Sequence, residues 1–248
     1  MATVPPAVLA RLLSLLLPGA CVLCGGHGEA ALCAPCRAQF FGLREPRCPI
    51  CAEQVPAGAT SAAICGRCLA RRPAYDATVV AASYDLPLDR LVLELKFGGR
   101  LAHARLFAEL LAEAVRGTPG FLSSSSSLPA LLCPVPLGPG RLAERGFNQA
   151  LEIARPLGRL LGIRVAAQLA QRVQDTAAQS KLRKSSRRAN IAHAFAIPDR
   201  ALVEGRHIGI VDDVMSSGQT LGELAAVLKR HGAARVTNFV FARTPLNR

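Results

Sequence analysis

From residue 75 onward, short apolar stretches alternate with longer segments in which apolar residues recur every three or four positions. The first pattern is typical of buried strands and the second of amphipathic helices. Strands are predicted at residues 79–84, 131–135, 163–165, 207–211 and 236–241, and helices at 88–95, 101–115, 147–161 and 221–228. Because strands and helices alternate without hairpin turns, we predict an α/β fold whose parallel sheet is covered on both faces.

The first 73 residues follow neither pattern for long. Residues 1–18 contain four leucines in helical spacing, which predicts a short amphipathic helix packed on the protein. The same stretch resembles a secretory signal, but no basic residue precedes it and Arg11 lies inside it, so we expect a cytoplasmic protein. Residues 19–73 are rich in cysteine, arginine and proline, and something other than an apolar core must stabilise them. We therefore predict a helix at 1–18, a cysteine-rich module at 19–73 and an α/β domain at 75–248.

Composition and charge limit the possible functions. Half of the 248 residues are apolar, which supports a sizeable core and excludes wholesale disorder. Lysine and arginine total 30 against 17 acidic residues, and this net charge of +13 favours a polyphosphate, a nucleic acid or an acidic membrane surface as partner. Residues 171–189 are strongly basic and predict an exposed loop of about 20 residues, a length usually kept for function or disorder. No apolar run approaches the roughly 20 residues of a membrane span, and an aromatic content of 4% leaves few platforms for stacking single-stranded nucleic acid.

Eight of the nine cysteines form four Cys-x-x-Cys pairs. Each pair can direct two sulfur atoms to one point, and two pairs complete a tetrahedral zinc site with no position left for water or substrate. The simplest grouping follows chain order, with Cys21, Cys24, Cys33 and Cys36 at one ion and Cys48, Cys51, Cys65 and Cys68 at a second; a crossed grouping and a single ion remain open alternatives. Disulfides need an oxidising compartment, and a thioredoxin-like site uses only one pair. We predict one or two structural zinc ions and place Cys133 in the core.

Residues 208–221, with the sequence IGIVDDVMSSGQTL, carry the most specific chemistry. An apolar strand runs into two acids, and a turn rich in hydroxyl groups then opens a helix, where Thr220 and Glu223 match a capping box. Backbone N–H groups in such a turn converge on an anion, and two carboxylates at the end of a strand suit sugar hydroxyls or a hydrated Mg²⁺. We predict that a 5-phosphate and its ribose bind at Asp212, Asp213, Ser216, Ser217, Gly218, Gln219 and Thr220. The alternative is a generic strand, turn and helix whose acids only meet water.

This segment resembles the signature of type I phosphoribosyltransferases, in which four apolar residues and two acids precede a Thr-Thr-Gly turn. Here Ser216-Ser217-Gly218 replaces that turn and keeps its hydroxyl groups. The resemblance implies a type I phosphoribosyltransferase sheet that binds 5-phosphoribosyl-1-pyrophosphate (PRPP) together with Mg²⁺.

Further motifs resemble one family, the ComF proteins linked to competence and DNA uptake. They are LKFGGR at 95–100, PVPL with Pro139 and Arg141 at 134–141, RGFNQ at 145–149, and TxxQ with Arg187 and Asn190 at 176–190. The cysteine-rich module is similar to the double zinc ribbon of many members, whereas Gly138 stands where the family often has histidine. The resemblance implies a pyrophosphate loop with Leu137, Gly138 and Arg141, and a mobile basic flap with Lys181, Arg183 and Arg187 that forms charge-assisted bonds to pyrophosphate. Lys96 and Arg100 are weaker candidates, for which an exposed basic helix end is an equal alternative.

Three functions follow from this reading. The resemblance favours a PRPP-binding ComF-type protein that assists uptake or processing of transforming DNA, with single-stranded DNA and DNA-processing proteins as partners. The second is an active phosphoribosyltransferase of nucleobase salvage, although no residues for recognising a base can be identified in the sequence. The third is a zinc-ribbon scaffold with a vestigial ligand site, which the intact pair of acids disfavours.

Overall fold

The computed structural model describes residues 19–42, 45–56, 58, 63–119, 128–173 and 194–245. The chain divides into two compact units between residues 44 and 45. The first unit holds the cysteines from 21 to 36, a short helix α2 (Ala34–Arg37) and a following π-helical turn (Ala38–Gly42). The second unit holds the remaining cysteines and the α/β region. The helix predicted at 1–18 lies outside the described residues, and the domain boundary predicted near residue 74 stays a prediction.

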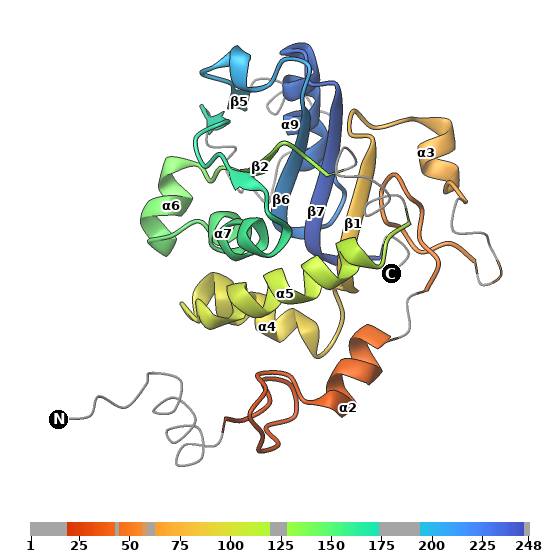
Figure 1. The fold of residues 1–248 in the computed structure, drawn as a ribbon, viewed down its shortest axis with the longest axis vertical. Coiled ribbons are helices and arrows are strands. Elements are labelled where there is room, and N and C mark those ends of the chain that lie inside the picture. The colour runs from red at the N-terminus through yellow and green to blue at the C-terminus, as the bar shows by residue number, and fades with distance from the viewer. Residues whose placement is uncertain are drawn as a thin grey trace, which may run out of the picture. The chain divides into compact units, whose positions relative to one another are not determined.

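The second unit is built on a five-stranded sheet in the order β1-β7-β6-β2-β3 (Figure 1). Its strands are β1 (Ala77–Ser83), β2 (Leu131–Pro134), β3 (Arg164–Val165), β6 (His207–Met215) and β7 (Arg235–Arg243). All pairings are parallel, which confirms the predicted fold class. The strand predicted at 207–211 extends four residues further, because β7 supplies partners as far as Met215. The two acids therefore lie inside the end of β6 rather than after it.

Helices cover both faces of this sheet. The predicted helices correspond to α4 (Leu88–Phe97), α5 (Ala102–Arg116), α7 (Gln149–Leu161) and α9 (Gln219–Arg230). Helices α5 and α7 pack on one face and α9 on the other (Figure 1). On the first face, the ring of Phe107 from α5 stacks on that of Phe241 from β7 at a centroid distance of 3.6 Å. In the described part of the second unit, three further short helices were not predicted: α3 (Gly66–Ala70), α6 (Pro139–Arg145) and a 3₁₀ turn (Arg200–Leu202).

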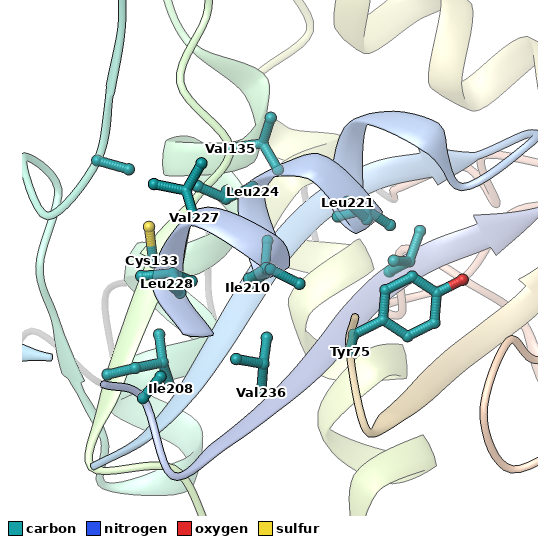
Figure 2. Packing of buried hydrophobic residues seen from close by; sticks show 14 of the residues in the cluster. Tyr75, Cys133, Val135, Ile208, Ile210, Leu221, Leu224, Val227, Leu228 and Val236 are labelled. Atoms are coloured by element: carbon teal, nitrogen blue, oxygen red, sulfur yellow. The ribbon is translucent and has the colours of Figure 1, made fainter. Parts of the chain in front are cut away.

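The core on the α9 face also contains the second cysteine group. Side chains of alternate strand residues, such as Ile208 and Ile210, meet Leu224 and other apolar residues of α9 (Figure 2). The same buried cluster continues into Cys51 and its neighbours at 48, 50 and 68. Cys133 is completely buried in β2, as predicted. The metal-binding loops of the second unit are thus part of the core of the α/β region.

A small antiparallel pair stands apart from the main sheet. It consists of β4 (Gln171–Arg172) and β5 (Phe195–Ala196), and the N–H of Val173 donates to the carbonyl of Ala194 at 2.9 Å. The loop predicted to begin at residue 171 therefore begins with a strand, because Phe195 and Ala196 supply a partner far along the chain. The predicted flap residues Lys181, Arg183 and Arg187 lie outside the described residues. Among the described residues, no helix is both long and apolar enough to cross a membrane.

Candidate functional site

The sulfur atoms of Cys21, Cys24, Cys33 and Cys36 all lie within 4.8 Å of one another. The Cys24 and Cys33 sulfurs are 3.8 Å apart, and zinc at 2.3 Å from four tetrahedral sulfurs requires a separation of about 3.8 Å. The N–H of Gly26 donates to the Cys24 sulfur, and the N–H of Cys33 donates to that of Cys21, each at 3.4 Å. Burial opposes ionisation of Cys21, but backbone hydrogen bonds lower its pKa to about 6. This group therefore fits a structural zinc ion.

The second group, Cys48, Cys51, Cys65 and Cys68, meets the same 4.8 Å criterion. Its Cys51 and Cys65 sulfurs are 3.5 Å apart. Burial and the neighbouring sulfurs raise the pKa of Cys68, because several thiolates cannot share one buried point without a cation. A divalent ion removes that repulsion, so the donor set again fits zinc. The structure groups the cysteines in chain order, one of the alternatives left open by the sequence.

The two acids at the end of β6 have different surroundings. Asp213 is buried, and its Oδ2 forms an ion pair with Lys96 Nζ at 2.8 Å. Asp212 accepts a hydrogen bond from the N–H of Asp213 at 2.9 Å. Burial and the charge of Asp213 raise the pKa of Asp212 well above its usual value. Lys96 thus neutralises one carboxylate of the pair, and ionisation of the other is opposed unless a further cation or a set of hydroxyl groups binds beside it.

Lys96 illustrates what the sequence could only suggest. It lies at the end of α4, which follows β1, and α4 packs beside α5. Asp213 shares the strand face of Gly209 and Val211, which is opposite that of Ile208 and Ile210. The LKFGGR motif made Lys96 a candidate, but its contact with Asp213 across 117 positions depends on the folded sheet. Arg100, by contrast, pairs with Glu94 at 3.5 Å and is 66% exposed.

The predicted phosphate turn connects β6 to α9. Its serines are exposed, and the Ser217 hydroxyl accepts a hydrogen bond from the N–H of Gln219 at 3.3 Å. Gly218 caps the helix with φ +77°, and a Cβ there would lie 2.5 Å from Met215 Cε. The expected capping box at Thr220 is wrong, because Gly218 is the N-cap and the helix begins at Gln219, which places Thr220 within the first turn. The helix therefore starts inside the predicted turn, two residues before Leu221.

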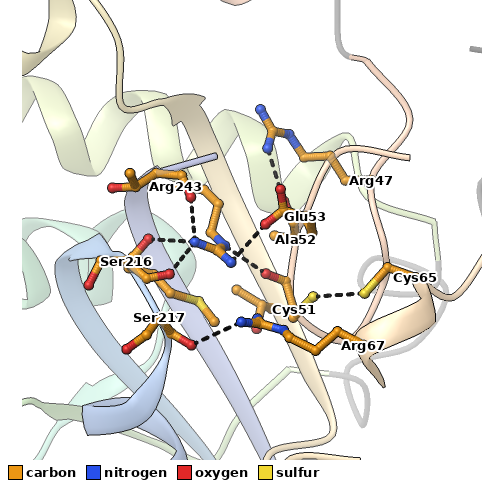
Figure 3. A network of polar contacts seen from close by, with 12 residues as sticks. Arg47, Cys51, Ala52, Glu53, Cys65, Arg67, Ser216, Ser217 and Arg243 are labelled. Atoms are coloured by element: carbon orange, nitrogen blue, oxygen red, sulfur yellow. Dashed lines mark hydrogen bonds and ion pairs between the residues drawn. The ribbon is translucent and has the colours of Figure 1, made fainter. Parts of the chain in front are cut away.

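Two arginines hold the turn from the side of the second cysteine group (Figure 3). Arg243, at the end of β7, is completely buried and donates to the carbonyls of Met215, Ser216, Thr244 and Cys51 and to the carboxylate of Glu53. Arg67, in α3 between Cys65 and Cys68, donates to the Ser217 carbonyl at 3.4 Å. Sequence reasoning missed both residues. A single arginine directly after the apolar run 239–242 was the only available signal for Arg243.

The predicted pyrophosphate loop follows β2, the neighbour of β6. The N–H of Val135 donates to the Val211 carbonyl at 2.9 Å, so both segments leave the same edge of the sheet. Residues predicted to form a loop instead enter α6, whose Pro139 has a φ already suited to a first helical turn. Gly138 is the buried N-cap of this helix, Leu137 is half-buried, and Arg141 is exposed. Their binding to pyrophosphate stays a prediction.

An open pocket of about 510 Å³ lies beside the phosphate turn. It is lined by Arg67, Cys68, Arg71, Arg72, Pro73, Tyr75, Ser217, Gly218, Gln219, Gly222 and Glu223. Three arginines face one glutamate in this lining, so the pocket has an excess of positive charge next to the turn.

Comparisons with known proteins agree with this architecture. Residues 12–69 match the model of a double zinc ribbon domain, and residues 144–246 match that of a phosphoribosyl transferase domain. Among solved structures, the match to the glutamine PRPP amidotransferase of B. subtilis covers 59% of this chain and 30% of that chain, with 15% sequence identity and a TM-score of 0.39. This likeness is too weak to carry an argument. The sheet and the two family matches define a phosphoribosyltransferase-fold protein that carries a double zinc ribbon.

Relatives extend along nearly the whole chain. DNA utilization protein YhgH of Salmonella typhi is 36% identical over 233 residues, which make up 93% of this chain and 99% of that protein. Competence protein F of Haemophilus influenzae is 31% identical over 227 residues, or 90% and 96% of the two chains. The chain belongs to the ComF family, as its motifs predicted.

Proposed function

We propose that this protein binds PRPP with Mg²⁺ and acts in the uptake or processing of DNA during natural transformation. One observation carries the ligand assignment: the acid pair, the phosphate turn and the segment after β2 leave the same edge of the sheet. The carboxyl edge of a parallel sheet is where open α/β folds bind ligands.

Each part of the edge has a separate role in this proposal. The turn at 216–220 holds the 5-phosphate with its backbone N–H groups and the positive end of α9. Asp212 and Asp213 hold the ribose hydroxyls, and Lys96 orients the second carboxylate through its ion pair. Mg²⁺ bound to the pyrophosphate would supply charge neutralisation. Leu137, Gly138 and Arg141 contact the pyrophosphate, together with Lys181, Arg183 and Arg187 from the flap.

Calorimetric titration of the zinc-loaded protein with PRPP tests the assignment. We expect saturable binding that requires Mg²⁺ and is lost when both Asp212 and Asp213 are changed to asparagine. Glu109→Gln, which removes a partly exposed acid from α5, is the matched control and should bind like the wild type. Absence of binding to the wild type, or unchanged affinity of the double variant, would reject the proposed ligand site.

The DNA role rests on family membership and on charge. The relatives are named for DNA utilization and competence, and Arg67, Arg71 and Arg72 give the pocket beside the turn an excess of positive charge that suits nucleic-acid phosphates. An electrophoretic mobility shift with single-stranded DNA should weaken steeply as salt is added. No shift at low salt would contradict direct contact with DNA.

The alternative is an active phosphoribosyltransferase of nucleobase salvage. Its support is the match of residues 144–246 to a phosphoribosyl transferase domain. Release of pyrophosphate from PRPP, screened against a panel of nucleobases, separates an enzyme from a protein that only binds the ligand. A scaffold with a vestigial site would show neither release nor PRPP binding.

We further propose that two zinc ions are bound and that the protein works in the cytoplasm. Nine free cysteines, eight of them in two groups that fit zinc, suit a reducing compartment.

A further inference from the structure

Hydrogen bonds donated by two arginines connect the second cysteine group to the start of the phosphate turn (Figure 3). Arg243 Nε donates to the carbonyl of Cys51 at 3.1 Å, and Arg243 Nη2 donates to Glu53 Oε2 at 2.8 Å. Cys51 is one of the four cysteines of the second group. The same guanidinium donates from Nη1 to the carbonyls of Met215 and Ser216. Arg67, which lies between Cys65 and Cys68, donates to the next carbonyl, that of Ser217. Two arginines therefore join the metal-binding loops to three consecutive peptide groups.

These contacts determine the direction in which the backbone N–H groups of the turn point. In a planar trans peptide, the N–H of a residue points opposite to the carbonyl of the residue before it. Because the carbonyls of residues 215 to 217 point at the arginines, the N–H groups of Ser216, Ser217 and Gly218 point away from them. Within the described residues, the turn hydrogen bonds include none donated by the N–H of Ser217 or Gly218. The turn is thus held as a row of oriented donors, the arrangement that binds anions.

The arginines depend on the cysteine loops in turn. The side chain of Arg243 is fully buried, and Glu53, two residues after Cys51, is its counterion. The first loop is also bonded to β1, because Thr78 donates from its N–H to the Pro49 carbonyl at 3.1 Å and from its hydroxyl to the Ile50 carbonyl at 2.7 Å. A change in the Cys48–Cys51 loop therefore removes partners from a buried cation, which is costly.

We propose that Arg243 and Arg67 are positioning residues that couple metal binding at Cys48, Cys51, Cys65 and Cys68 to sugar-phosphate binding at residues 216–218. The proposal rests on the proposed function for the identity of the ligand. Linkage then requires reciprocity: metal in this group strengthens PRPP binding, and PRPP retains the metal by the same factor. The group at Cys21–Cys36 belongs to the other compact unit and shares none of these contacts.

Zinc release to a chromogenic chelator, followed with and without saturating Mg²⁺-PRPP, tests the coupling. We expect two zinc ions per chain, and PRPP should slow the release of only one of them. The loss of one hydrogen bond to a charged group corresponds to a change of about tenfold or more in the release rate. In Arg67→Ala and Arg243→Lys this protection should shrink, since lysine lacks the planar fork of donors that arginine uses here. Arg105→Ala, which removes an exposed arginine from α5, is the matched control and should keep full protection. Equal PRPP effects on both populations, or full protection in both variants, would overturn the proposal.

A second measurement needs no ligand. Hydrogen exchange at the amides of Gly222 and Thr244, which donate to the carbonyls of Gly218 and Met215, should accelerate by about ten- to a hundredfold when zinc is stripped from the full-length protein. Unchanged exchange would overturn the coupling even if PRPP binds. Accelerated exchange in a protein that fails to bind PRPP would instead reject the proposed ligand and leave the coupling intact.

Discussion

Replacing Lys96 with methionine removes the cation that faces the buried acid while keeping a chain of similar length. The two charges are 2.8 Å apart, with Asp213 only 4% exposed and Lys96 21% exposed. Their attraction is about 6 kcal/mol at an effective dielectric constant of about 20, and breaking a buried pair typically costs about 3–5 kcal/mol. Because Lys96 retains some contact with water, we expect Lys96→Met to lower the free energy of unfolding by about 2–4 kcal/mol at pH 7.

A double-mutant cycle separates the ion pair from general packing effects. Urea unfolding of Lys96→Met, of Asp213→Asn and of the double variant gives the coupling energy between the two side chains. We expect the double variant to be more stable than the sum of the single effects predicts, because asparagine no longer needs a cation. Excess Mg²⁺ should also recover part of the stability of Lys96→Met, since it can neutralise the same acids.

The exposed pair between Arg105 and Glu109 is the control for this cycle. Arg105 is 81% exposed, so its coupling to Glu109 should be within about 0.5 kcal/mol of zero. A coupling between Lys96 and Asp213 as small as that of the control would refute the assignment of Lys96 to the site.

Four further predictions concern the same edge and the metal groups. Asp212→Asn should raise the free energy of unfolding at pH 7 while abolishing Mg²⁺-PRPP binding. Because the pKa of Asp212 is raised in the folded state, its carboxyl group contributes stability below the unfolded pKa, and that contribution is lost as the pH rises through the folded pKa. The stability gained by the asparagine variant, measured by urea unfolding, should therefore vanish in acid. For the same reason, PRPP affinity of the wild type should fall as pH is lowered through that raised pKa, measured by calorimetry at several pH values. Gly218→Ala should destabilise the protein by more than about 1 kcal/mol in thermal unfolding and weaken PRPP binding, because φ +77° and the close Met215 Cε both oppose a Cβ. Metal analysis should find two equivalents of zinc in the reduced, folded protein, and less than half an equivalent would contradict both cysteine groups.

Local patterns predicted the main sheet and the four longest helices of the described residues, for an identifiable reason. The spacing of apolar residues along the sequence already indicates the burial of residues such as Ile208, Ile210 and the leucines of α9. The pair β4–β5 left no such signal, since two residues on each side of a long segment form it. Helix α6 was also missed, because its residues 139–144 are exposed and lack an apolar stripe.

The candidate site likewise contains residues that a local motif predicts and residues that only the folded structure brings to it. Asp212, Asp213 and the turn at 216–220 are contiguous, so one motif predicted them together. Lys96 and Arg243 reach the site from other elements, and only tertiary structure decides that the arginine at the end of β7 is buried against five acceptors. Chain order suggested the grouping of the cysteines, but spacing alone did not exclude a crossed arrangement.

The bonds from Thr78 to the Cys48–Cys51 loop have a consequence for the behaviour of the purified protein. β1 pairs with β7 on one side only, and its other side is the border of the sheet. The Pro49 carbonyl accepts the N–H that this border presents at Thr78. An open strand border invites pairing with another molecule. Chelation should therefore promote self-association of the protein, visible as an increase in light scattering, before it produces any wholesale unfolding.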